Sequence, residues 1–114
     1  MKRFEVWQSG RLCASYVFKA DTFFARLRGL MFRSALMPGE GLLLSGCSAI
    51  HCCFMRFPID AVYLSKNMTV IARETVKPWR VGRIFRGTKN VLELEAGAAA
   101  MLENGETIEI RECD

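Results

Sequence analysis

The chain has 114 residues, of which 51% are hydrophobic and 25% are charged, and its formal net charge at neutral pH is +4. This length is typical of one domain, and the hydrophobic fraction excludes an intrinsically disordered chain. No apolar run approaches the roughly 20 residues that span a bilayer, and polar residues interrupt the N-terminal stretch where a signal peptide needs an apolar core. We therefore expect a single cytoplasmic domain over residues 1–114, without a membrane segment.

The first third of the chain predicts two strands and a helix. Aromatic and β-branched residues favour strands at Phe4–Trp7 and Leu12–Phe18, joined by a turn at residues 8–10. Asp21 or Thr22 is suited to cap a helix in the segment that follows. The apolar face of this predicted helix carries Phe23, Leu27, Leu30 and Met31 at helical spacing.

The middle of the chain predicts a buried strand and a hairpin. A turn at residues 38–41 leads into a strand that opens at Leu42. The segments Ala61–Leu64 and Met68–Ile71 have the composition of two paired strands. Asn67 between them is suited to the left-handed position of the connecting turn.

The last third predicts two more strands and a short helix. Pro78 interrupts the regular pattern at residues 77–80, because proline has no amide hydrogen to donate to a sheet. Residues 90–95 predict a strand, residues 96–106 a short helix that stops at Asn104, and residues 107–111 a final strand. The predicted fold is mostly β: a compact single-domain β-sandwich or barrel-like sheet, with one helix near the N-terminal third and a short helix before the last strand.

Several stretches together suggest a family. The motifs FFARLRGLMFR, PGEGLLL, IHCCFMRFPIDAVYL, KPW, VLELEAG and NGE occur in this order between about Ala20 and Ile110. In this combination the chain resembles the domain-of-unknown-function family 192, a small bacterial and archaeal family. The resemblance implies a small β-rich fold and no particular reaction, because the family is uncharacterised. The chain departs from the family at Cys52–Cys53, where threonine or an aromatic residue is usual, and at Gly105–Glu106, where glycine-aspartate is more common.

The cysteines do not form a recognisable metal or disulfide motif. An odd number of cysteines in a chain without an export signal favours free thiols. His51 and Cys53 lie two residues apart on a predicted strand and could share an ion, but no motif spacing adds Cys13 or Cys113 to them. His51 and Cys52 are neighbours and point to opposite faces of a strand, which disfavours a paired nucleophile. We therefore predict no metal site and no cofactor. The five cysteines are Cys13, Cys47, Cys52, Cys53 and Cys113.

The segment HCCFMRFPID predicts a buried strand with polar residues at its ends, and two interpretations remain open. His51, Arg56 and Asp60 must be paired if they are buried. In the structural interpretation, Arg56 and Asp60 form a salt bridge and His51 bonds to the backbone. In the other, the three residues line a pocket in which Arg56 holds a carboxylate or phosphate through two parallel hydrogen bonds. Trp79 and Arg80 would then form the opposing wall of that pocket.

These residues favour a non-catalytic binding domain for a small anionic or polar molecule, or for a protein partner. One alternative is an enzyme, a hydrolase or transferase, that uses His51 and Asp60 as an acid–base pair. A second alternative is nucleic-acid binding through the basic stretch 80–89, in which a cation recurs at every third position. Few aromatic residues interleave with these cations, so nucleic acid is disfavoured, and no membrane partner is expected.

Overall fold

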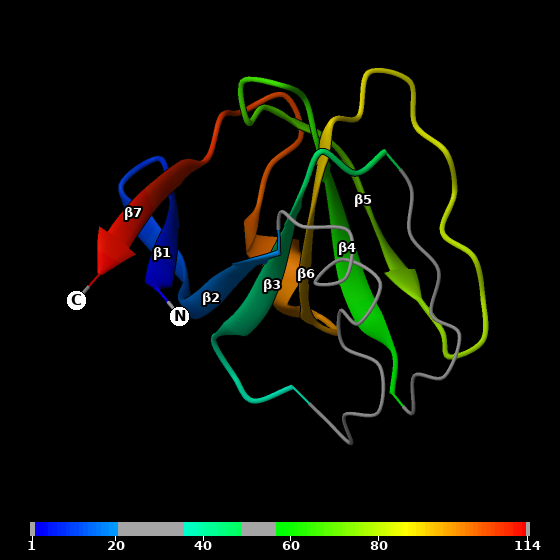
Figure 1. Ribbon diagram of the computed structural model, residues 1–114, viewed down its shortest axis with the longest axis horizontal. Helices are drawn as coiled ribbons and strands as arrows, with labels where there is room; N and C mark the ends of the chain where they lie inside the picture. The colour runs from blue at the N-terminus through cyan, green and yellow to red at the C-terminus, as the bar shows by residue number, and fades with distance from the viewer. Residues whose placement is uncertain (1, 21–35, 49–56, 114) are drawn as a thin grey trace.

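The computed structural model describes residues 2–20, 36–48 and 57–113, and these residues form one seven-stranded sheet (Figure 1). The elements are β1 (Arg3–Gln8), β2 (Arg11–Ala20), β3 (Glu40–Ser45), β4 (Ile59–Leu64), β5 (Val70–Val76), β6 (Asn90–Glu95), the 3₁₀ helix η1 (Ala98–Met101) and β7 (Glu109–Cys113). The strand order is β5-β4-β6-β3-β2-β1-β7. Strands β2 and β3 are parallel, and the other neighbours in the sheet are antiparallel.

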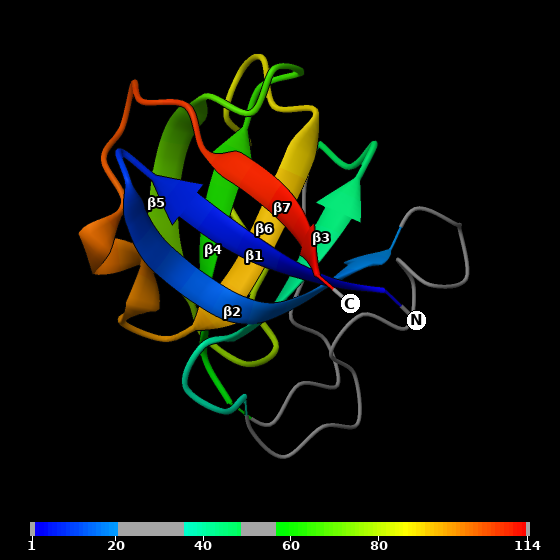
Figure 2. The same ribbon diagram turned by 90° about the vertical axis from the view of Figure 1, so that its left-hand side faces the viewer.

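The sheet coils so strongly that its two ends approach each other. Figure 2 shows β1, β2 and β7 passing in front of β4 and β6. The chain before β7 meets the start of β5, where the Ile108 amide donates to the Met68 carbonyl at 2.9 Å and the Val70 amide donates to the Glu106 carbonyl at 3.0 Å. The mostly β prediction is confirmed. The described residues form one coiled sheet, which corresponds to the barrel-like alternative and not to a two-sheet sandwich.

An apolar core lies on each face of the sheet. The inner core joins β1 and β2 to β4 and β6 through Val6, Val17, Val62, Leu64, Leu92 and Leu94. The outer core covers the other face of β3, β4 and β6 and contains Leu44, Ile59, Ala61, Tyr63 and Val91. Successive side chains of a strand point to opposite faces, so β4 supplies both cores, and all six of its residues are buried.

The helix predictions differ from the structure. Within residues 96–106 only the four residues of η1 are helical, so the predicted short helix is wrong in type and length. Gly97, just before η1, has the left-handed φ of 95°, and Leu102, just after it, is extended and fully buried. The chain therefore leaves the helical conformation to bury Leu102 in the inner core. The helix predicted to begin at Asp21 or Thr22 lies outside the described residues. No helix among the described residues is long and apolar enough to cross a bilayer.

The hairpin turns follow the sequence with one exception. Ser9 and Gly10 both have positive φ, as the tight hairpin between β1 and β2 requires, which confirms the predicted turn. Between β4 and β5 the left-handed residue is Met68, with a φ of 67°, and not Asn67. The Met68 amide donates to the Ser65 carbonyl at 3.0 Å. This closes a type I turn, which places the left-handed residue one position after its central pair.

Gly41 in β3 allows a close approach between β3 and β6. A Cβ atom at this position would lie 2.8 Å from Leu94 Cδ2 and 2.9 Å from the Glu93 carbonyl oxygen. We expect Gly41→Ala to lower the free energy of unfolding by about 2 kcal/mol, because both contacts lie in a packed core. Gly10→Ala is the control, with no atom near the added methyl, and should cost about 1 kcal/mol through its left-handed φ alone. Urea unfolding measures both, and a larger loss for Gly10→Ala would contradict this account.

Candidate functional site

The residues predicted to form a site fall into three places. His51 and Arg56 lie outside the described residues, so the two interpretations that depend on them stay predictions. Asp60 is the second residue of β4 and is 4% exposed. Trp79 and Arg80 are exposed and lie in the connection between β5 and β6.

The carboxylate of Asp60 joins three elements at one end of the inner core. Its Oδ1 accepts a hydrogen bond from Thr75 Oγ1 of β5 at 2.7 Å. Its Oδ2 accepts from the backbone amides of Gly97 at 2.8 Å and Ala99 at 3.0 Å, at the start of η1. A buried carboxylate requires such partners, and these three donors satisfy it within the chain.

Arg73 of β5 binds the opposite end of η1. Its Nη1 donates to the carbonyl oxygens of Ala99 at 2.8 Å and Ala100 at 3.1 Å, and also to that of Leu102. A carboxylate at the amide end and a guanidinium at the carbonyl end match the polarity of the backbone groups there. A surface depression of about 330 Å³ adjoins these groups, but their hydrogen bonds serve η1. The arrangement favours a structural role for Asp60 over an acid–base role.

The structural role of Asp60 can be tested by two substitutions. Asp60→Ala removes the acceptor for two backbone amides, and we expect the free energy of unfolding to fall by about 3 kcal/mol. Asp60→Asn keeps one oxygen for the amides and one polar group for Thr75. The free energy of unfolding should therefore fall by about 1 kcal/mol in this variant. Urea unfolding measures both losses, and hydrogen exchange at Ala99 should accelerate only in Asp60→Ala. Equal losses would contradict the role given to these bonds.

Glu93 of β6 is a second buried acid, and it lies on the outer face. Its side chain is 4% exposed, and Oε1 has no hydrogen-bond partner among the described atoms. Burial raises the pKa of this carboxyl from its ordinary value of 4.5 to about 8. Glu93 is therefore mainly protonated at neutral pH. The sequence did not reveal it, because the alternation of Leu92, Glu93 and Leu94 is typical of a strand with one solvated face.

A second carboxyl lies in the same row of the sheet. Ala61 of β4 is paired with Glu93 on one side and with Glu74 of β5 on the other, so both acids flank this alanine on the outer face. Glu74 Oε2 accepts hydrogen bonds from the Tyr63 hydroxyl at 2.6 Å and from the Arg83 amide at 2.7 Å. Glu74 thus holds other elements in place, whereas Glu93 Oε1 does not.

Glu93 makes stability depend on pH in a defined direction. The unfolded chain loses this proton near pH 4.5 and the folded protein near pH 8, so the folded state binds more protons between these values. The free energy of unfolding should therefore fall as pH rises, by about 3 kcal/mol between pH 5 and pH 8 from this group. Glu93→Gln is neutral throughout and should remove that decline. Urea unfolding at several pH values tests this, and an unchanged slope in Glu93→Gln would contradict it.

The connection between β5 and β6, residues 77–89, is here called the β5–β6 loop, and it is anchored along its length. Its first turn is closed by the Arg80 amide, which donates to the Lys77 carbonyl at 3.1 Å. Its middle is held by the Arg83 amide on Glu74. The Phe85 ring packs against Tyr63, with the ring centroids 4.7 Å apart. In Figure 1 the loop forms the outer side of the molecule next to β5.

The outward surface of the β5–β6 loop combines exposed apolar and cationic side chains. Trp79 is 62% exposed, Val81 71% and Ile84 82%. The loop contains no acidic residue, and its cationic residues, all exposed, are Lys77, Arg80, Arg83, Arg86 and Lys89. Trp79 has the left-handed φ of 64°, which is uncommon for a bulky side chain. The sequence indicated the basic stretch, but not that Val81 and Ile84 would be exposed.

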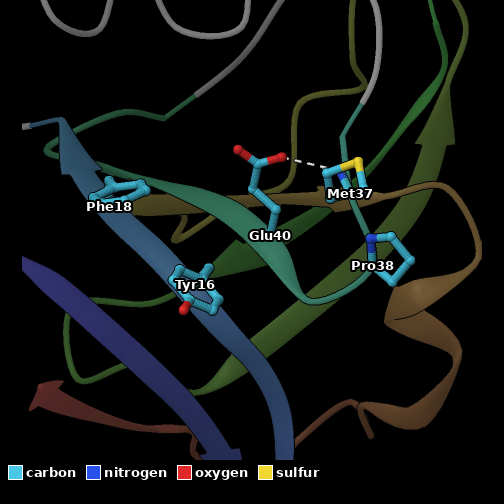
Figure 3. A pocket seen from close by; sticks show the side chains of 5 residues that line it. All are labelled: Tyr16, Phe18, Met37, Pro38 and Glu40. Atoms are coloured by element: carbon cyan, nitrogen blue, oxygen red, sulfur yellow. Dashed lines mark hydrogen bonds between the residues drawn. The ribbon is translucent and has the colours of Figure 1, made fainter.

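A shallow apolar pocket lies elsewhere, between β2 and the chain that leads into β3 (Figure 3). It has a volume of about 360 Å³ and is lined by Tyr16, Phe18, Met37, Pro38 and Glu40. The carboxylate of Glu40 accepts a hydrogen bond from the Met37 amide at 2.9 Å, so this polar group organises the turn. Tyr16 and Phe18, which lie two positions apart on β2 and so point to the same face, are the signal for this pocket in the sequence.

Among the described cysteines, Cys13 and Cys113 are free thiols. Burial raises the pKa of the Cys13 thiol, so this sulfur is protonated at neutral pH and suits a core residue better than a nucleophile. Cys52 and Cys53 lie outside the described residues.

The fold and the loop define a small domain of one coiled β-sheet that presents a cationic, partly apolar surface. The sequence profile of DUF192, a family described as uncharacterised ACR, matches residues 5–110. The chain belongs to this family, which confirms the resemblance read from its motifs.

Relatives of the chain are named UPF0127 proteins. The UPF0127 protein of Pyrococcus furiosus is 33% identical over 98 residues, which are 79% of this chain and 82% of that protein. A UPF0127 protein of Thermococcus sibiricus is 32% identical over 95 residues, and the match covers 77% of this chain but only 60% of that protein.

Two crystal structures have a similar fold. One is a protein of unknown function from Novosphingobium aromaticivorans, with a TM-score of 0.79 and 21% identity, covering 93% of this chain and 82% of that one. The other is a protein from Sinorhizobium meliloti named as a candidate transcription regulator, with a TM-score of 0.77 and 23% identity, covering 95% of this chain and 92% of that one. At these identities the likeness shows the fold alone.

Proposed function

We propose that this protein is a non-catalytic binding domain for an anionic partner, either a small molecule or an acidic protein segment. The observation that carries the proposal is the β5–β6 loop, in which exposed cations occur without any acidic residue. Trp79 and Arg80 of the predicted site both belong to this loop and are both exposed. An arginine beside an exposed indole ring suits a ligand with an anionic group and an apolar part.

The anchoring of the loop supports a binding role. Connections of this length without regular structure are uncommon in compact domains and are usually functional or disordered. Here Arg83 and Phe85 fix the loop to Glu74 and Tyr63 of the sheet. A loop held in this way presents its cations with a smaller loss of conformational entropy on binding.

The alternative of an enzyme receives less support. Its predicted acid–base pair requires Asp60 to exchange a proton with His51, but Asp60 already accepts three hydrogen bonds and is 4% exposed. A group that organises backbone amides in this way is poorly placed to accept a further proton during a reaction.

Binding of anions to the loop can be measured through Trp79. In Trp7→Phe the only remaining tryptophan is Trp79, and its fluorescence should change on titration with citrate, inorganic phosphate or a polyglutamate peptide. Arg80→Ala combined with Arg86→Ala in this background should weaken binding at least tenfold, because two of the loop cations are lost. Binding should also weaken as the salt concentration rises.

A matched control separates the loop from net charge. Arg11→Ala combined with Lys66→Ala removes the same charge from two exposed positions outside the loop, and it should leave affinity within about twofold. If both pairs of substitutions weakened anion binding equally, net charge alone would explain the effect. The absence of any fluorescence or thermal response to all three probes would contradict the proposal.

A further inference from the structure

The exposed apolar side chains are the feature of the β5–β6 loop that simple anion binding leaves unexplained. Val81 and Ile84 are 71% and 82% exposed, and with Trp79 they lie within six positions of one another. The other large exposed hydrophobic residues in the described part of the chain are Leu12, Tyr16, Met37 and Met101. Large apolar side chains that are this exposed and this close together in one loop favour a contact with another apolar phase or molecule.

We infer that the β5–β6 loop docks on the surface of a lipid bilayer that contains anionic phospholipids, an inference that rests on the proposed anion binding by the same loop. Arginines interleave with the apolar residues, since Arg80 and Arg83 fall on either side of Val81. A bilayer interface meets both needs at once: lipid phosphates attract the guanidinium groups, and the acyl boundary receives the aliphatic side chains. A tryptophan is suited to the level of the headgroups between them.

Nucleic acid fits the same loop less well. Binding to single strands uses aromatic rings on which bases stack, and the loop contains Trp79 and Phe85. The Phe85 ring is already packed against Tyr63, which leaves Trp79 as the one exposed ring of the loop. Val81 and Ile84 have no flat face to offer a base, and exposed aliphatic side chains add nothing to phosphate binding.

The contacts that attach the β5–β6 loop to the domain lie on the side of the loop that faces the sheet. Phe85 points to the sheet, the Thr88 side chain donates to the Phe85 carbonyl at 2.8 Å, and the Lys89 amide donates to the Leu64 carbonyl at 2.8 Å. These contacts use main-chain groups and inward side chains, so docking of the outward side chains requires no rearrangement of the sheet. Peripheral docking of this kind needs no spanning segment, which is why the absence of a long apolar run did not predict it.

The inference is tested by sedimentation of the full chain with vesicles of phosphatidylcholine alone and of phosphatidylcholine with 30% phosphatidylglycerol. We expect binding to the anionic vesicles at least tenfold stronger than to the neutral ones. In Trp7→Phe, Trp79 emission should shift to the blue with the anionic vesicles and be quenched by a doxyl-labelled lipid.

Substitution of the apolar side chains separates docking from anion binding. Val81→Ser combined with Ile84→Ser should weaken binding to the anionic vesicles at least tenfold and leave citrate binding within twofold. Leu12→Ser combined with Met37→Ser is the matched control, because it removes two exposed apolar side chains outside the loop, and it should bind vesicles like the unsubstituted chain.

Three results would overturn the inference. The first is that Val81→Ser combined with Ile84→Ser leaves vesicle binding unchanged. The second is that neutral and anionic vesicles are bound equally well. The third is that citrate, polyglutamate or duplex DNA is bound at protein concentrations at which no vesicle is bound. If citrate or polyglutamate binds in the last case, the proposed function survives and the partner is a soluble anion, whereas binding of duplex DNA alone would favour the nucleic-acid alternative. If neither vesicles nor soluble anions bind, both proposals fail together.

Discussion

The burial of β4 on both faces is the constraint on which the rest of the structure depends. All six of its residues are buried between β5 and β6, so its one acid, Asp60, must find partners inside the protein. It finds two of them in the first amides of η1, which fixes that turn over the end of the inner core. The alternate residues of β4 face outward, and Tyr63 among them receives Phe85 of the β5–β6 loop. The position of the exposed β5–β6 loop therefore depends on β4, a strand that solvent does not reach.

Asp60 and Glu93 show two outcomes of burying a carboxyl group in neighbouring strands. Asp60 is compensated by three donors, whereas Glu93 Oε1 has none in the described part of the chain, and burial raises the pKa of Glu93 to about 8. Deprotonation of Glu93 would also place a negative charge across Ala61 from the carboxyl group of Glu74, which accepts the hydrogen bond from the Arg83 amide that anchors the loop. A rise in pH should therefore weaken the outer face, on which the β5–β6 loop is anchored.

Local chemistry made most of the sheet predictable, and tertiary packing explains what was missed. Ser9 and Gly10 supply the positive φ of a tight hairpin, and the strands at β1, β2 and β4 follow from aromatic and β-branched residues. The alanines after Gly97 have high helix propensity, but burial of Leu102 and the contacts of Asp60 and Arg73 limit them to η1. The burial of Glu93 depends on what covers the outer face, which its own strand does not encode.

The cations and the aliphatic side chains of the β5–β6 loop have different physical explanations. β5 is an edge strand, and charged residues beside an edge discourage pairing with a second chain, so the arginines alone would be accounted for without any ligand. Val81 and Ile84 have the opposite effect, because exposed aliphatic side chains beside an edge favour association. A fold that needed only protection of its edge would have polar residues at both positions. The pairing of the two kinds of side chain is expected where a surface must bind anionic headgroups and an apolar boundary together.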